Sequence, residues 1–102
     1  MESYAVPVDD RRLILVVEDE EINRAILEMV LEKDFDVIFA QDGEEALAKI
    51  AENRDLLSLV ILDLIMPGMP GLEALRLIRA NQEYQDIPVI VASGDQIGRA
   101  HV

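Results

Sequence analysis

The chain has 102 residues and a formal net charge of -12 at pH 7, so it can form one folded domain whose surface repels nucleic acid and anionic membranes. We therefore expect no nucleic-acid binding by this domain and no membrane contact, and a divalent cation is the favoured ligand. The chain lacks cysteine, which excludes disulfide and thiol chemistry. It also lacks a signal-peptide start and an apolar run of about 20 residues, which predicts a cytoplasmic protein.

The first apolar run, 13–17, predicts a strand because it is continuous and rich in β-branched residues. A helix is expected after it, since apolar residues recur at helical spacing at Ile22, Ala25, Ile26, Met29 and Val30. Asp19 or Glu20 is placed to cap the first turn of this helix. The start of the chain thus has the pattern of a strand followed by a helix.

The same alternation continues along the rest of the chain, with strands predicted at 37–40, 57–62 and 87–92. Pro88 fits the last strand only near its start or on an edge. Two helices separate these strands, and we expect their inward-facing residues to be Ala46, Leu47, Ile50 and Ala51 in one and Leu72, Leu75 and Ile78 in the other. Alternating strands and helices predict an α/β fold, a doubly wound parallel sheet covered on both faces.

We divide the chain into an N-terminal extension (1–12), a folded domain (13–94) and an irregular tail (95–102). The tail has no clear period. The sequence shows no internal repeat, linker or low-complexity tract. These features predict one compact unit with short flanking segments.

Polar residues follow three of the predicted strands at their carboxyl ends: Glu18 and Asp19 after the first, Asp63 after the third and Ser93 after the fourth. In an open α/β sheet the functional crevice lies beyond these ends. Taken alone, Glu18 and Asp19 are equally well explained as an acidic helix start, and Asp63 as a turn residue. The occurrence of polar residues at the same end of three separate strands favours a functional site.

Three carboxylates within a few ångström repel one another unless a hard cation neutralises them, and Mg²⁺ prefers such oxygen ligands. Glu18 and Asp19 are placed to hold the ion, and Asp63 is the natural nucleophile toward a phosphoryl group. The Ser93 hydroxyl could then hydrogen-bond a phosphate oxygen. The sequence therefore predicts a magnesium-dependent phosphoryl-transfer site.

Three segments resemble the receiver domain of two-component response regulators: 15–21 (LVVEDEE), 60–73 (VILDLIMPGMPGLE) and 88–94 (PVIVASG). The likeness covers about residues 13 to 94, and Asp-x-x-Met-Pro-x-x-x-Gly after a strand is a specific pattern. It implies a flavodoxin-like (CheY-like) fold, a five-stranded parallel sheet in the order 2-1-3-4-5 between five helices. It also implies that a sensor histidine kinase is the partner that donates the phosphoryl group.

The resemblance implies a role for each of six residues. Asp63 is the phosphoacceptor, Glu18 and Asp19 are the acidic pair for Mg²⁺, the backbone carbonyl of Ile65 is a further ligand, Ser93 is the switch hydroxyl and the Gly94 amide contacts phosphate. Met66, Pro67 and Gly71 match the loop that shapes the site.

The chain departs from the family pattern after residue 94, where receivers continue through a helix, a strand with a phosphate-binding Lys, and a last helix. The lysines of this chain, Lys33 and Lys49, lie in or next to the first two predicted helices and cannot serve. We therefore expect the strand order 2-1-3-4 and weakened phosphorylation. Strand 87–92 would then be an exposed edge, which predicts self-association by edge pairing or by exchange of elements.

The leading interpretation is a response regulator receiver module, not an enzyme, that forms an aspartyl phosphate at Asp63 and is impaired by truncation. The alternative is a pseudo-receiver that acts through protein contact or dimerisation without phosphorylation. A phosphatase with an aspartyl nucleophile is disfavoured because Ile65 occupies the position where such enzymes commonly carry a second acid. A nucleotide-binding role is disfavoured because no Gly-rich loop follows the first strand.

Overall fold

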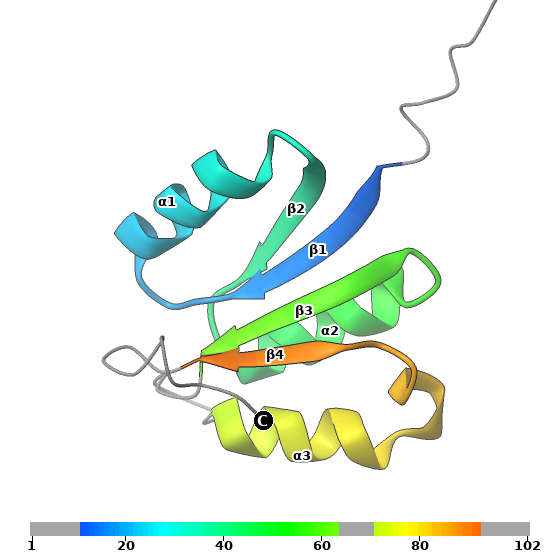
Figure 1. Cartoon of the computed structure of the whole chain (residues 1–102). Coiled ribbons are helices and arrows are strands. Elements are labelled where there is room, and N and C mark those ends of the chain that lie inside the picture. The colour runs from blue at the N-terminus through cyan, green and yellow to red at the C-terminus, as the bar shows by residue number, and fades with distance from the viewer. Residues whose placement is uncertain (1–10, 64–70, 93–102) are drawn as a thin grey trace, which may run out of the picture.

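The structure, a computed structural model, describes residues 11–63 and 71–92. Most of the predicted extension (1–12) and all of the predicted tail (95–102) lie outside these ranges. Strands and helices alternate along the described part of the chain (Figure 1): β1 Arg12–Val17, α1 Glu21–Leu31, β2 Phe35–Ala40, α2 Gly43–Asn53, β3 Leu57–Asp63, α3 Gly71–Ala80, the short 3-10 helix η2 Gln82–Tyr84, and β4 Val89–Ala92.

The strands form a parallel sheet in the order β2-β1-β3-β4, as predicted. Val17 at the end of β1 lies beside Ala40 of β2 and Leu62 of β3, and Asp63 lies beside Ala92 of β4. This register brings the carboxyl ends of all the described strands to one edge of the sheet. Residues that follow β1 and β3 therefore start from neighbouring positions.

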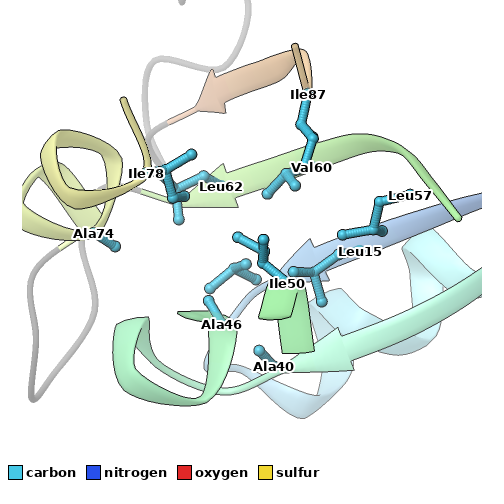
Figure 2. Packing of buried hydrophobic residues seen from close by; sticks show 11 residues of the cluster. Leu15, Ala40, Ala46, Ile50, Leu57, Val60, Leu62, Ala74, Ile78 and Ile87 are labelled. Atoms are coloured by element: carbon cyan, nitrogen blue, oxygen red, sulfur yellow. The ribbon is translucent and has the colours of Figure 1, made fainter. Parts of the chain in front are cut away.

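One face of the sheet is covered by α2 and α3, and the main core lies there (Figure 2). Leu15 of β1 and Ile50 of α2 are both fully buried in it. Because side chains alternate between the two faces of a strand, Ile14 and Val16 point to the opposite face, where they are also buried. That second face carries α1, so the sheet is doubly wound as predicted.

Helix α1 has no buried residue, although its sequence is clearly amphipathic. Four apolar side chains of this helix remain 49 to 73% exposed: Ile22, Ile26, Met29 and Val30. The side of α1 toward the sheet is formed instead by half-buried residues, among them Leu27 and Leu31. The apolar spacing thus identified the helix but not the side that packs on the sheet.

The predicted inner faces of the other helices are partly wrong. Ala46 and Ile50 of α2 are buried as expected, but Ala51 is exposed. In α3 Leu72 is 63% exposed, and Ala74 is fully buried in its place. A small side chain allows the helix to approach the sheet closely, so the buried position follows packing distance and not hydrophobicity alone.

Helices α1 and α2 differ in how their first turns are capped. The Asp42 carboxylate accepts a hydrogen bond from Glu45 N at 2.8 Å, and Glu45 in turn accepts from Gln41 N at 2.8 Å. This reciprocal pair satisfies free N–H groups at the start of α2. The N-cap of α1 is Glu20, but its side chain makes no capping hydrogen bond, so the predicted side-chain cap there is wrong.

Arginines hold the loops at the opposite, amino-terminal edge of the sheet. Arg11 donates to the Asp36 carboxylate at 2.9 Å and to the Phe35 carbonyl at 2.6 Å. Arg79 of α3 donates to the Ile87 carbonyl at 2.6 Å, just before β4. These bonds give backbone carbonyls charged donors at the start of β2 and just before β4. No helix in the described ranges is long and apolar enough to cross a bilayer.

Candidate functional site

Three carboxylates meet at the carboxyl edge of the sheet. Glu18 and Asp19 directly follow β1, and Asp63 is the last residue of the neighbouring strand β3. One oxygen from each carboxylate lies within 4.8 Å of the other two. All three residues are partly buried. The convergence that the strand ends predict is therefore present in the structure.

The pKa of Glu18 is raised above its ordinary value, chiefly because burial disfavours its charged form. Hydrogen bonds from the Glu20 backbone and the Asn23 side chain act in the opposite direction, while the charges of Asp63 and Asp19 add to the increase. The cluster thus holds its negative charges at a cost in free energy. A cation between these carboxylates would remove that cost.

The loop that carries Glu18 is held by several hydrogen bonds. Glu18 N donates to Ala40 O at 3.0 Å, and Arg24 Nη1 donates to Glu18 O at 2.8 Å. The Glu18 Oε2 atom accepts from Glu20 N at 3.2 Å and from Asn23 Nδ2 at 3.4 Å. Both the backbone and the side chain of Glu18 are therefore restrained.

Asn23 and Arg24 were not singled out from the sequence. Both lie near the start of α1, and their side chains turn back to Glu18. No signal in the sequence separates these two residues from ordinary solvent-facing residues of an acidic helix.

The donor set fits a hard divalent cation. Mg²⁺ binds oxygen ligands at about 2.1 Å in octahedral geometry, so its ligand atoms are separated by about 3 to 4.2 Å. The oxygen atoms of the cluster lie within 4.8 Å of one another, a spacing that small rotations of the partly buried carboxylates can adjust to these values. Carboxylate oxygens without nitrogen or sulfur donors favour Mg²⁺ over softer transition metals.

The remaining predicted site residues, Ile65, Ser93 and Gly94, lie outside the described residues, as do Met66 and Pro67. Lys33 follows the end of α1 and precedes β2, which places it toward the opposite edge of the sheet from the carboxylates. Lys49 lies within α2.

Residues 14–99 match the family model of the response regulator receiver domain. The chain belongs to this family. Receiver domains are the modules of two-component signalling that accept phosphoryl groups, and they are generally signalling modules and not enzymes. The receiver family binds Mg²⁺ through acidic residues, which agrees with the cluster of three carboxylates at this edge of the sheet.

Individual relatives agree with the family assignment. The chain is 44% identical over 93 residues to response regulator RR06 of Streptococcus pneumoniae, covering 87% of this chain and 40% of that protein. A response regulator receiver protein of Pseudomonas putida has a similar structure, with a TM-score of 0.74 and 36% identity over 83% of this chain and 69% of that one. The Mn²⁺-bound form of response regulator Rcp1 gives a TM-score of 0.71 at 30% identity over 80% and 65% of the two chains. The receiver spans less than half the length of the first curated relatives it matches.

Proposed function

We propose that this receiver accepts a phosphoryl group on Asp63 from a sensor histidine kinase in two-component signal transduction. The observation that carries the proposal is the meeting of Glu18, Asp19 and Asp63 at the carboxyl ends of two paired strands. Asp63 ends a strand that is paired on both sides, with β1 and β4. Its backbone is therefore fixed, and its carboxylate is presented at the edge where the acidic pair lies.

The transfer forms one bond and breaks one. A carboxylate oxygen of Asp63 forms the new O–P bond while the P–N bond of the donor phosphohistidine breaks, and the imidazole leaves with the electron pair and takes a proton. Glu18 and Asp19, together with Asp63 itself, would hold Mg²⁺, which offsets charge on the phosphoryl oxygens when bound. The Mn²⁺-bound structure of Rcp1 supports a divalent cation in a related protein.

We extend the proposal to three residues beyond the described ranges. The Ile65 carbonyl would be a further metal ligand, Ser93 the hydroxyl that bonds the phosphoryl group, and the Gly94 amide a donor to phosphate. Their place in the sequence, directly after β3 and β4, is what supports these roles.

We further propose that modification of this polypeptide is weak. Lys33 follows α1 and Lys49 lies within α2; we expect neither to reach the phosphoryl group, whose charge would then be offset mainly by the metal and by backbone N–H groups. The same observation favours the alternative, a pseudo-receiver that binds Mg²⁺ and a protein partner without being phosphorylated.

Incubation with acetyl phosphate and Mg²⁺ tests the proposal, with intact mass as the measurement. We expect slow addition of one phosphoryl group to the wild type and none to Asp63→Asn or to the wild type in excess chelator. Asp55→Asn is the matched control, because it makes the same charge change at the other end of β3, where the side chain is 91% exposed. This variant should be modified like the wild type.

Each other result is informative. Modification that persists in Asp63→Asn would show that the acceptor is wrong. Magnesium binding without any modification would favour the pseudo-receiver. Rapid and complete modification of the wild type would contradict the proposed impairment.

We also propose that this polypeptide self-associates through β4. Among the described strands β4 pairs on one side only, with β3, and Ile90 is 52% exposed. An edge strand with an apolar side chain presents unpaired backbone groups that another chain can bind. Light scattering across a range of concentrations should therefore detect a dimer.

A lysine on the edge should disrupt this pairing, because charged residues on edge strands oppose strand addition. We expect Ile90→Lys to lower the dimer fraction several-fold. Ile26→Lys is a close control, since Ile26 of α1 is 49% exposed and undergoes the same chemical change away from the edge. Loss of the dimer in Ile26→Lys alone would show that the interface lies on α1. A wild type that stays monomeric would contradict the proposal.

A further inference from the structure

Arg24 ties helix α1 to the loop that carries the acidic pair. Its Nη1 atom donates to the carbonyl oxygen of Glu18 at 2.8 Å, and this contact is partly buried. Arg24 N also donates to Glu20 O at 3.0 Å within the first turn of the helix. The residue thus links both ends of the segment between Glu18 and Glu20.

The bond from Arg24 acts on the peptide unit between the two acids. Glu18 N is held by Ala40 O at 3.0 Å, and Arg24 holds the Glu18 carbonyl on the other side of the same residue. Fixing both groups limits rotation of the backbone from which the Glu18 and Asp19 side chains leave. The directions of both carboxylates therefore depend on a contact that neither carboxylate makes.

We propose that Arg24 is a positioning residue for the magnesium site, which orders the Glu18–Asp19 loop before the ion arrives. The inference rests on the proposed function, because it assumes that this cluster holds Mg²⁺. Arginine suits the task because its rigid guanidinium presents several N–H donors to a backbone carbonyl, and the bond to the Glu18 carbonyl does not require the ion. Asn23 contributes less, since its contact with Glu18 Oε2 is longer, at 3.4 Å.

Two effects of Arg24 on metal affinity have opposite signs. Its positive charge repels an approaching cation, but at a partly exposed site that repulsion is screened by water and salt. Its hydrogen bond orders the ligands, and loss of such outer contacts typically lowers metal affinity about 10- to 100-fold. The ordering effect should therefore prevail, and removing Arg24 should weaken magnesium binding.

Isothermal titration with MgCl₂ tests this inference on the whole chain. We expect Arg24→Met to raise the Kd for Mg²⁺ about tenfold and Arg24→Lys to raise it less, because Lys keeps the charge and one donor. Arg76→Met is the matched control: it removes the same charge from an exposed residue of α3 whose contact is with Glu73 on the same helix. That variant should bind Mg²⁺ like the wild type.

Thermal unfolding in chelator accompanies each titration, so that every Kd is measured on folded protein. If Arg24→Met does not fold, Arg24→Lys decides the question. An unchanged or lower Kd in the folded Arg24 variants would overturn the inference while leaving the proposed function intact. A wild type that does not bind Mg²⁺ would instead overturn the magnesium part of the proposed function, and the inference with it.

Discussion

Replacing Leu15 with Ala is expected to leave the protein largely unfolded or close to unfolding at room temperature. Leu15 is fully buried in β1, between β2 and β3, and packs in the core beneath α2 (Figure 2). Leu-to-Ala changes at such positions cost about 2 to 5 kcal/mol of unfolding free energy. Domains of this size have a total of only about 5 to 15 kcal/mol.

The stability of this domain should lie near the low end of that range, because α1 buries none of its residues. Urea unfolding followed by circular dichroism gives the free energies. Leu56→Ala is the matched control, since Leu56 precedes β3 and is 67% exposed; surface changes of this kind usually stay within about 0.5 kcal/mol. Equal unfolding midpoints for the two variants would contradict the packing described for Leu15.

The strands could be predicted from the sequence because each contains a continuous apolar run, which is most buried in the central strands β1 and β3. Two strand starts differ from the prediction by two residues each: β2 was predicted from residue 37 and begins at Phe35, whereas β4 was predicted from residue 87 and begins only at Val89. Pro88 explains the later start of β4, since proline has no N–H to donate to a neighbouring strand. Its carbonyl still accepts a hydrogen bond from Val60 N at 3.0 Å, so the chain is already aligned there.

Helix orientation was less predictable than helix position. The helical spacing of apolar residues shows that Leu72 and Ala74 belong to one helix, but it does not show which of the two faces the sheet. The structure buries Ala74 and leaves Leu72 exposed, because the approach distance between helix and sheet decides the face. The same limit applies to α1, where apolar residues at helical spacing remain in solvent.

The acidic cluster was predictable because parallel strands bring their carboxyl ends to one edge, so residues 45 positions apart in sequence become neighbours. The supporting residues were not, because an arginine or asparagine in an acidic helix reads as an ordinary solvent-facing residue. Arg24 acquires its importance only through its contact with a backbone carbonyl, and backbone acceptors leave no trace in the sequence.

The two edges of the sheet have opposite chemistry. Arg11 and Arg79 bind backbone carbonyls at the amino-terminal edge, and Arg11 also pairs with the Asp36 carboxylate. The carboxylates of Glu18, Asp19 and Asp63 crowd together at the carboxyl-terminal edge. The first arrangement stabilises the fold, whereas mutual repulsion among the carboxylates disfavours the second. The stabilising arginine contacts and the proposed functional site therefore lie at opposite ends of the same strands.

Replacing Asp63 with Asn should make the metal-free protein more stable and should nearly abolish its response to Mg²⁺. The change removes one of three mutually repelling charges and keeps the shape of the side chain, so the melting temperature in chelator should rise by about 5 °C, equivalent to about 1 kcal/mol. Saturating Mg²⁺ should stabilise the wild type by about 2.7 kcal/mol at a concentration 100 times Kd, and Asp63→Asn by much less.

Asp55→Asn again provides the control, because it makes the same change in net charge at a side chain that is 91% exposed. If the overall charge of -12 were the cause, both variants would gain stability equally in chelator. A gain confined to Asp63→Asn locates the repulsion in the cluster. A loss of stability in Asp63→Asn would show that the stabilising interactions of this carboxylate outweigh its repulsion by Glu18 and Asp19. That result would contradict a cluster whose repulsion is relieved by a cation.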